Sequence, residues 1–337
     1  MMDEQTIIQV DGLTKYFPIR RGLFKRSASP VRAVDDIRLT VLQGETFGLV
    51  GESGCGKSTL GRCLLRAIEP TGGNIRYRDR GGAEIDVRGL DKKGLRAIRR
   101  ELQLVFQDPY SSLNPRMTVA ELVGEPLICH GIARGGEMRR RVTALIETVG
   151  LSARHLDRYP HAFSGGQRQR IGIARALATE PRFLVCDEAV SALDVSVQAQ
   201  ILNLLRELQQ RLGLSYLFIS HDLGVIRHIS DRVGVMYVGK LVETARTEEL
   251  YAHPFHPYTE ALLSAKPIPD PRRKADRIVL SGEVANPANP PSGCYFHPRC
   301  PYARDVCRTE APPMKQVSAD RAAACHFAGE LGLRGAL

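Results

Sequence analysis

The sequence predicts an α/β fold with a phosphate-binding core, an antiparallel β subdomain, an inserted helical subdomain and a Pro/Cys-rich C-terminal extension. Three observations support this prediction. An apolar run leads into a glycine-rich loop at Leu49–Leu60, and apolar residues recur at helical spacing between residues 119 and 151. Four of the eight cysteines fall within the last 44 residues, which core packing does not explain.

The composition is that of an ordinary globular protein, with 43% hydrophobic and 25% charged residues among 337. No apolar run of about 18 residues occurs, and acidic residues stand where a secretory signal needs basic ones, so we expect neither a membrane span nor a signal peptide. The net charge of +10 comes from dispersed small clusters. A solvated basic face or an anionic membrane surface therefore explains the charge better than a nucleic-acid partner.

Apolar periodicity and turn residues predict the elements in chain order. The expected strands lie at residues 7–17, 31–42, 45–50, 74–87 (a pair), 102–106, 182–186, 216–220, 232–238 and 240–244. The expected helices lie between Lys57 and Pro70, before residue 100, at 119–128, 142–151, 196–212 and 248–251, and after Ser164. From His253 onward prolines cluster and the periodicity fades.

The glycine-rich loop matches the P-loop pattern G-x-x-x-x-G-K-[ST]. Its glycines allow backbone N–H groups to point inward at phosphate oxygens, and the following helix adds the positive end of its dipole. Lys57 would reach the β- and γ-phosphates, and the Ser58 hydroxyl would ligate Mg²⁺. A glycine-rich turn without a ligand is the alternative. The residues expected at the nucleotide are Gly51, Ser53, Gly54, Cys55, Gly56, Lys57, Ser58 and Thr59.

Two acids end the apolar strand at 182–186, as in a Walker B site. Asp187 would hold Mg²⁺ on the strand next to the P-loop strand, and Glu188 would orient and deprotonate the water that attacks the γ-phosphate. The alternative is an acidic strand end that faces solvent. The P-loop upstream favours the catalytic interpretation.

The string Phe163-Ser164-Gly165-Gly166-Gln167-Arg168-Gln169-Arg170 predicts a second phosphate site. Ser164 is a good N-cap, and Gly165 and Gly166 leave backbone N–H groups unshielded at a helix start. An ordinary capped helix is the alternative. A site so far from the P-loop would serve a different nucleotide or a different subunit.

These motifs, with Gln107, the segment Ser191-Ala192-Leu193-Asp194 and His221, resemble the ATP-binding subunit of an ABC transporter over roughly residues 5 to 250. The resemblance implies a P-loop NTPase core of the RecA-like type. It also implies a head-to-tail dimer, in which each nucleotide lies between Lys57 of one subunit and the Ser164–Gln167 segment of the other.

The resemblance further implies roles for single residues. Phe17 would stack on adenine, with Tyr16 as the alternative. Gln107 would touch Mg²⁺ and the attacking water, His221 would contact the γ-phosphate, and Asp194 would meet the partner subunit. Two residues depart from the common pattern, because Phe163 replaces the usual leucine and Ala189 stands where a proline usually follows the catalytic glutamate. Neither change removes a charged or glycine position.

The segments at 253–271 and 289–294, and the inserted Arg20–Lys25, resemble oligopeptide and dipeptide importer ATPases. The resemblance implies a motor subunit at the cytoplasmic face of the cell (inner) membrane, with two transmembrane permease subunits and, indirectly, an extracytoplasmic peptide-binding protein. A paralogous ATPase would complete the dimer, although a homodimer is an alternative. Import of nickel, glutathione or another small solute, or a soluble ATPase acting on nucleic acid, are the other interpretations. We expect an ATP-binding domain at 5–252, with its helical subdomain at about 111–179, and an extension at 253–337.

The four late cysteines, Cys294, Cys300, Cys307 and Cys325, are spaced C-x5-C-x6-C-x17-C. Four thiolates in a reducing compartment suit zinc or an iron–sulfur cluster better than disulfides. The spacing lacks the C-x2-C pairs typical of structural zinc, and the resemblance favours a [4Fe–4S] cluster. Zn²⁺ and unligated thiols are the alternatives.

Overall fold

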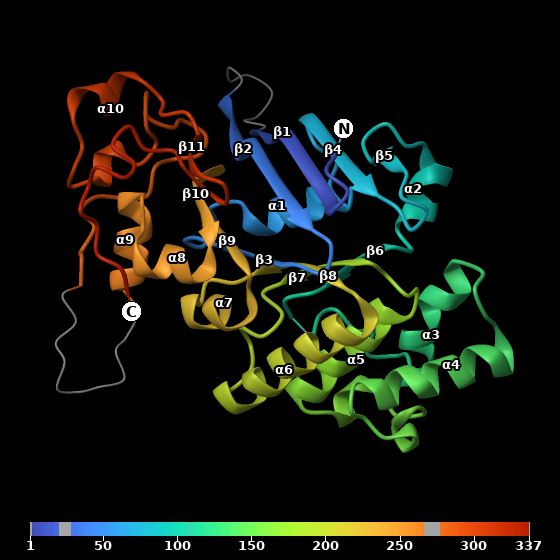
Figure 1. Cartoon of the computed structure of the whole chain (residues 1–337). Coiled ribbons are helices and arrows are strands. Elements are labelled where there is room, and N and C mark those ends of the chain that lie inside the picture. The colour runs from blue at the N-terminus through green and yellow to red at the C-terminus, as the bar shows by residue number, and fades with distance from the viewer. Residues whose placement is uncertain (1, 20–27, 109, 266–276, 337) are drawn as a thin grey trace. The chain divides into compact units, whose positions relative to one another are not determined.

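A computed structural model describes residues 2–19, 28–108, 110–265 and 277–336 (Figure 1). The chain divides into two compact units. Unit 1 comprises residues 1–9, 40–46 and 76–219, and unit 2 comprises residues 10–39, 47–75 and 220–337. The inserted segment Arg20–Lys25, and residues 266–271 of the proline-rich segment, lie outside the described residues.

The parallel strands of unit 1 are β6 (Leu102–Val105), β7 (Phe183–Asp187) and β8 (Ser215–Ile219). Every residue of β7 and β8 is buried, which explains why both strands read as apolar runs. β7 pairs with β6 on one side and with β8 on the other. The expectation that the strand of Asp187 lies next to the P-loop strand is therefore wrong, because both edges of β7 are already occupied.

Helices form most of the rest of unit 1, and the helix expected at 142–151 runs instead from Gly135 to Thr148. They are α2 (Lys92–Ile98), α3 (Val119–Cys129), α4 (Gly135–Thr148), α5 (Gly165–Leu177) and α6 (Val195–Leu212). α3 begins with a reciprocal capping box between Thr118 and Glu121. The predicted strand pair is also present, since the end of β4 (Gly72–Arg78) pairs antiparallel with β5 (Glu84–Asp86).

Unit 2 contains most of the P-loop strand β3 (Thr46–Val50), which runs parallel to β9 (Arg232–Tyr237). β9 pairs antiparallel with β10 (Lys240–Arg246). Two short strands of the extension, β12 (Arg321–Ala323) and β11 (Lys315–Ser318), continue this sheet beyond β10. Strands β1 (Thr6–Ile19) and β2 (Ala28–Leu42) match the strands expected at 7–17 and 31–42, of which the second was predicted from its alternation. In unit 2 they join β4 in the order β2-β1-β4.

The helices of unit 2 are short. They are α1 (Lys57–Leu64), α7 (Leu223–Ile229), α8 (Thr247–Ala252), α9 (Pro257–Ser264) and α10 (Asp305–Thr309). α1 ends well before Pro70, where the prediction placed its end, and Arg66 has a left-handed φ of 47° that a continuing helix does not allow. Among the described helices, none is long and apolar enough to cross a membrane.

An aromatic cluster joins the extension to the sheet of unit 2. The rings of Tyr237, Tyr258 and Phe296 lie 4.7 to 5.4 Å apart, centre to centre, and all three side chains are almost fully buried. Such rings contribute both buried area and favourable edge-to-face geometry. The extension is therefore packed into the apolar core of unit 2.

Candidate functional site

The P-loop of unit 2 connects β3 to α1 and depends on glycine at its two ends. Gly56 is the N-cap of α1 with a φ of 107°. A Cβ atom at Gly56 would lie 1.9 Å from the carbonyl oxygen of Ala33, and one at Gly51 would lie 2.1 Å from that of Met236. Any larger residue would therefore displace the backbone, and the glycines let the loop pass close to its neighbours.

Lys57 lies inside the curve of this loop. Its side chain is buried, and Nζ donates to the carbonyl oxygens of Gly51 at 2.7 Å and Glu52 at 3.0 Å. These contacts hold the ammonium group in the loop before any phosphate arrives. Ser58 follows in the first turn of α1, and Ser53 and Gly54 are exposed at the tip of the loop.

Two other predicted residues of unit 2 lie at strand ends. His221 is exposed, and it follows Ser220, whose N–H donates to the carbonyl oxygen of Leu49 at 3.2 Å. His221 is thus placed near the strand that enters the P-loop. Phe17 is 37% exposed, and the Lys15 ammonium lies 4.8 Å from the centre of its ring.

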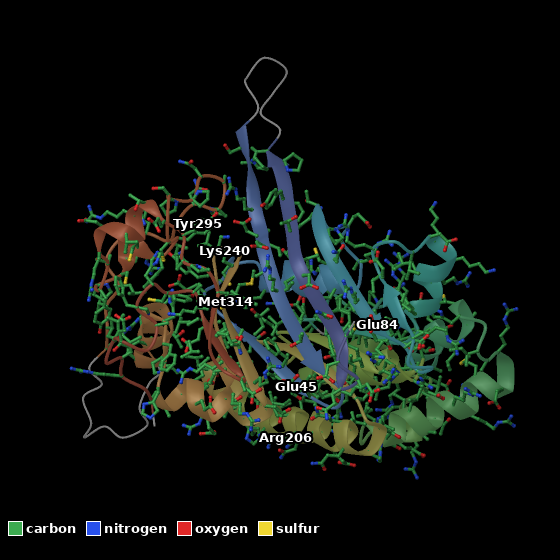
Figure 2. The ribbon with its side chains drawn as sticks, turned by 45° about the horizontal axis from the view of Figure 1, so that its top comes forward. Glu45, Glu84, Arg206, Lys240, Tyr295 and Met314 are labelled. Carbon is green, nitrogen blue, oxygen red and sulfur yellow. The ribbon has the colours of Figure 1, made fainter. Side chains whose placement is uncertain are left out.

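Tyr16, the alternative to Phe17, is engaged in a polar network. Its hydroxyl donates to Oδ1 of Asp35 at 2.6 Å, and the Tyr295 hydroxyl donates to Oδ2 at 2.8 Å. Burial, with the hydrogen bond to Asp35, raises the pKa of Tyr16 to about 12. Lys240 lies 3.4 Å from the same carboxylate and beside Tyr295 (Figure 2). Because this network holds Tyr16, Phe17 is the freer ring to stack on a base.

In unit 1 the two acids of the predicted Walker B site and Gln107 occupy neighbouring strand ends. Asp187 is the buried last residue of β7, and Glu188 follows it with a left-handed φ of 47°. The Glu188 N–H donates to the carbonyl oxygen of Ile219 at 3.0 Å. The amide of Gln107 donates to Oε2 of Glu188 at 2.8 Å. Two residues that are 81 positions apart are therefore in direct contact at the ends of neighbouring strands.

Ser164 caps α5 in the way the sequence predicts. Its hydroxyl accepts from the Gln167 N–H at 3.4 Å, and the Gln167 side chain accepts from the Ser164 N–H at 3.1 Å. Gly166 is required for packing, because a Cβ atom there would lie 2.3 Å from Cγ1 of Val197. Ser164 is exposed, so the start of α5 is accessible.

Asp194 has a local role that sequence reasoning missed. It is the N-cap of α6 and accepts from the Val197 N–H at 2.9 Å and from the Ser196 hydroxyl at 2.7 Å. The Val197 and Ser196 hydrogen bonds lower the pKa of its carboxyl group. An aspartate that precedes a helical run is the signal that could have revealed this cap.

Two arginines of α5 also went unpredicted. The Arg168 guanidinium lies 4.0 Å from the centre of the Tyr110 ring, and Arg175 donates to the carbonyl oxygen of Ser112 at 2.8 Å. Both contacts connect α5 to the segment that follows Gln107. The sequence shows that these two arginines lie seven positions apart and so share one face of the helix, but it does not show their partners.

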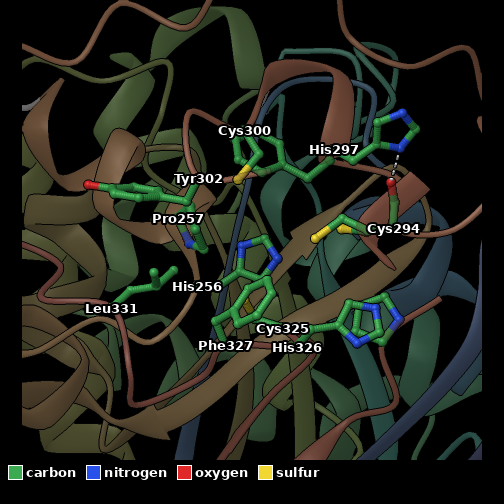
Figure 3. A pocket seen from close by; sticks show the side chains of 13 residues that line it. His256, Pro257, Cys294, His297, Cys300, Tyr302, Cys325, His326, Phe327 and Leu331 are labelled. Atoms are coloured by element: carbon green, nitrogen blue, oxygen red, sulfur yellow. Dashed lines mark hydrogen bonds between the residues drawn. The ribbon is translucent and has the colours of Figure 1, made fainter. Parts of the chain in front are cut away.

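The extension brings its four late cysteines to one pocket (Figure 3). The pocket holds about 330 Å³ of space not filled by atoms, part of it open to solvent. Its other lining residues are His256, Pro257, Phe296, His297, Tyr302, Pro312, His326, Phe327 and Leu331. Burial raises the pKa of the Cys294 thiol to about 11 and that of Cys300 to about 12. Without a bound cation these two thiols are protonated at neutral pH.

The lining of this pocket offers four thiols, three imidazoles and no carboxylate, and these donor types suit zinc or an iron–sulfur cluster. In the part of the chain that the structure describes, no group of three or more histidine, cysteine or acidic residues is arranged to hold a metal ion.

Comparisons with known proteins agree with the motifs. A family model described as ABC transporter matches residues 34–191, and one described as oligopeptide/dipeptide transporter, C-terminal region, matches residues 242–307. A probable peptide ABC transporter ATP-binding protein of Sinorhizobium fredii is 53% identical over 320 residues, which cover 95% of this chain and 89% of that protein. The oligopeptide transport ATP-binding protein AppF of Bacillus subtilis is 50% identical over 328 residues, covering 96% and 98%.

Solved structures show the same relationship. The ATP-binding cassette MJ0796, a dimer in a post-hydrolysis state with ADP and Pi, matches with a TM-score of 0.62 and 28% identity, covering 72% of this chain and 99% of that one. The resemblance predicted from the motifs is confirmed. The chain belongs to the ATP-binding subunits of ABC transporters, in the oligopeptide and dipeptide subfamily, and is an ABC-type ATPase.

Proposed function

We propose that this chain is the ATP-hydrolysing motor subunit of an importer for dipeptides or oligopeptides. The observation that supports hydrolysis best is the contact between Gln107 and Glu188 at the end of β7, because it pairs a carboxylate with an amide where water would be activated. The match of residues 242–307 to the oligopeptide transporter C-terminal region supports the peptide substrate.

The residues divide the chemistry among themselves. Lys57 and the P-loop N–H groups bind the β- and γ-phosphates, and Ser58, Gln107 and Asp187 would hold Mg²⁺, which neutralises phosphate charge when bound. Glu188 takes the proton of the attacking water, and His221 contacts the γ-phosphate. Phe17 stacks on the adenine, consistent with its exposed ring.

The partners follow from the divided site. The accessible start of α5 offers a second phosphate contact, so each nucleotide would lie between Lys57 of one subunit and Ser164–Gln167 of the other, with Asp194 near the dimer interface. A paralogous ATPase completes the pair, and two transmembrane permease subunits and an extracytoplasmic peptide-binding protein complete the importer. The chain would attach peripherally to the cytoplasmic face of the inner membrane. The boundary between the ATP-binding domain and the extension falls near residue 252.

The test is peptide-stimulated ATP hydrolysis by the chain reconstituted with the permease and binding-protein products of neighbouring genes. Glu188→Gln should lower the hydrolysis rate at least about a hundredfold and still bind ATP. Lys57→Ala should lose ATP affinity itself. Glu207→Gln, an exposed glutamate on α6, is the matched control and should hydrolyse ATP normally. Normal turnover by Glu188→Gln, or no stimulation by any peptide, would contradict the proposal.

For the cysteine pocket we propose a [4Fe–4S] cluster held by Cys294, Cys300, Cys307 and Cys325, with Zn²⁺ as the alternative. The convergence of the four residues on one pocket supports it. Protein purified without oxygen should contain iron and acid-labile sulfide, and should absorb broadly at the blue edge of the visible range. One equivalent of zinc without iron would establish the alternative.

A further inference from the structure

The extension contacts the P-loop itself, at Glu52. Arg299 forms a two-pronged ion pair with this carboxylate: one guanidinium nitrogen lies 2.9 and 3.2 Å from its two oxygens, and the other lies 3.2 Å from Oε1. The Glu52 N–H donates to the Tyr258 hydroxyl at 2.8 Å. Arg299 and Tyr258 are 247 and 206 positions downstream of Glu52, so both contacts depend on the folded extension.

Both partners of Glu52 are held firmly. Tyr258 is fully buried, and its ring packs against Tyr237 and Phe296. The Arg299 side chain is only 9% exposed and ends the short helical turn His297–Arg299 that follows Phe296. A contact whose side chains are fixed by packing is preorganised, and a two-pronged arginine–carboxylate pair is among the stronger charged hydrogen bonds.

Because Glu52 lies in the P-loop, these contacts can affect nucleotide binding. The loop that must receive several phosphate charges carries a carboxylate of its own, and Arg299 neutralises it. The carbonyl oxygen of Glu52 also accepts from Lys57 Nζ, while its N–H is fixed by Tyr258. Glu52 therefore affects the phosphate site in two ways: its carboxylate determines the local charge, and its carbonyl oxygen helps to position Lys57.

We propose that Arg299 and Tyr258 are positioning residues for the P-loop, so that the ATP affinity of the cassette depends on its carboxy-terminal extension. This inference rests on the proposed function of the P-loop as the nucleotide site. Arg299 precedes Cys300 and follows Cys294 by five positions, so the cysteine pocket and the P-loop contact share one short segment.

The test measures the affinity of the purified chain for a fluorescent ATP analogue with Mg²⁺ by anisotropy, since the chain has no tryptophan to report binding. Arg299→Met should raise the Kd about tenfold, because an unpaired carboxylate then repels the phosphates. The KM for ATP should rise similarly, while kcat stays within about twofold. Arg299→Lys should recover part of the affinity, because it restores the charge without the fork.

The double variant Glu52→Gln with Arg299→Met separates positioning by charge from a general structural effect. Removing the carboxylate should bring the Kd back to within about threefold of wild type. Tyr258→Phe, which leaves the Glu52 N–H without its acceptor, should raise the Kd at least about threefold. Arg246→Met, which breaks an exposed ion pair in the same unit, is the control and should bind like wild type.

Three outcomes would overturn the inference: wild-type affinity in Arg299→Met, the same loss in the single and double variants, or wild-type affinity in Tyr258→Phe. If Arg299→Met does not fold, the Tyr258→Phe result decides alone. Lys57→Ala in the same assay tests the underlying function separately. Retained affinity in that variant removes the P-loop as the nucleotide site, whereas lost affinity there with normal binding in the Arg299 and Tyr258 variants removes only the positioning role.

Discussion

Replacing Arg321 with methionine should destabilise the chain strongly. Among the described ion pairs, Arg321 is the only cation that contacts the buried carboxylate of Glu243. Glu243 on β10 is 0% exposed, and its Oε1 lies 3.2 Å from the guanidinium of Arg321 on β12. Its two oxygens also accept from the N–H groups of Phe255 at 2.8 Å and His256 at 3.0 Å. The Arg321 guanidinium packs over the Phe255 ring.

The expected loss of stability depends on the hydrogen bonds that Glu243 keeps in the variant. Losing one partner of a buried pair typically costs about 3–5 kcal/mol, because the other charge is left unpaired. Here the two N–H groups still bind the carboxylate, and methionine keeps most of the buried apolar stem. We therefore expect the lower end, about 3 kcal/mol, or a fall in Tm of at least about 5 °C. Circular dichroism is the assay, since tryptophan fluorescence is not available in this chain.

An exposed ion pair between the same two elements provides the matched control. Arg246, at the end of β10, lies 2.7 Å from Asp320, just before β12, and the two side chains are 65% and 40% exposed. Arg246→Met should lower the Tm much less than Arg321→Met does, because water already screens that pair. Equal shifts in Tm for the two variants, or a shift under about 1 °C for Arg321→Met, would refute the reasoning.

The pH dependence of the Arg321→Met deficit has a definite sign. Burial raises the pKa of Glu243 in the folded chain, so the folded state binds this proton more tightly than the unfolded state. Such a group favours folding at low pH, and its contribution is lost as the pH rises through the raised pKa. Without Arg321 the pKa rises further, so the deficit in Tm should shrink between pH 8 and pH 5.5. A deficit that grows on acidification would contradict this account.

The remaining predictions concern the nucleotide site. Gly56→Ala should abolish ATP binding in the anisotropy assay, since its Cβ would overlap the Ala33 carbonyl oxygen. Gly213→Ala, at a positive φ of 65° but with no atom within 4 Å of the new Cβ, should cost only about 1 kcal/mol and bind ATP normally. Ser164→Ala should cost about 1 kcal/mol through its lost helix cap and weaken ATP-driven dimerisation measured by light scattering, whereas Ser164→Thr should restore both. Dimerisation unaffected by Ser164→Ala would remove the start of α5 from the nucleotide interface.

The sequence predicted the core because buried parallel strands leave a readable signal. β7 and β8 are buried throughout, mostly apolar, and each is followed by a polar residue, so both their place and their chemistry were visible. The N-cap Ser164 likewise marked the start of α5. What failed was adjacency: the order of parallel strands depends on crossover connections, and no local pattern shows that β8 lies beside β7.

The extension was predicted poorly for a different reason. β11 is exposed at all four residues and β12 has only three, so neither carries an alternating pattern. These strands form because β10 offers an edge with free hydrogen-bonding groups, and this is a property of the folded sheet. The sequence did predict that the four cysteines belong together, because their density alone required an explanation.

The contacts that link the extension to the rest of unit 2 explain why its short, proline-rich segments hold a defined structure. Few apolar residues are available there, yet Phe296 enters the core, Arg321 neutralises a buried acid and Arg299 neutralises an acid of the P-loop. The partner of each contact lies in the cassette: Tyr237 for Phe296, Glu243 for Arg321 and Glu52 for Arg299. These contacts therefore stabilise the folded structure of the extension. The same dependence runs in reverse: Glu243 would be a buried unpaired charge, and Glu52 an uncompensated one beside the phosphates, if the extension were displaced.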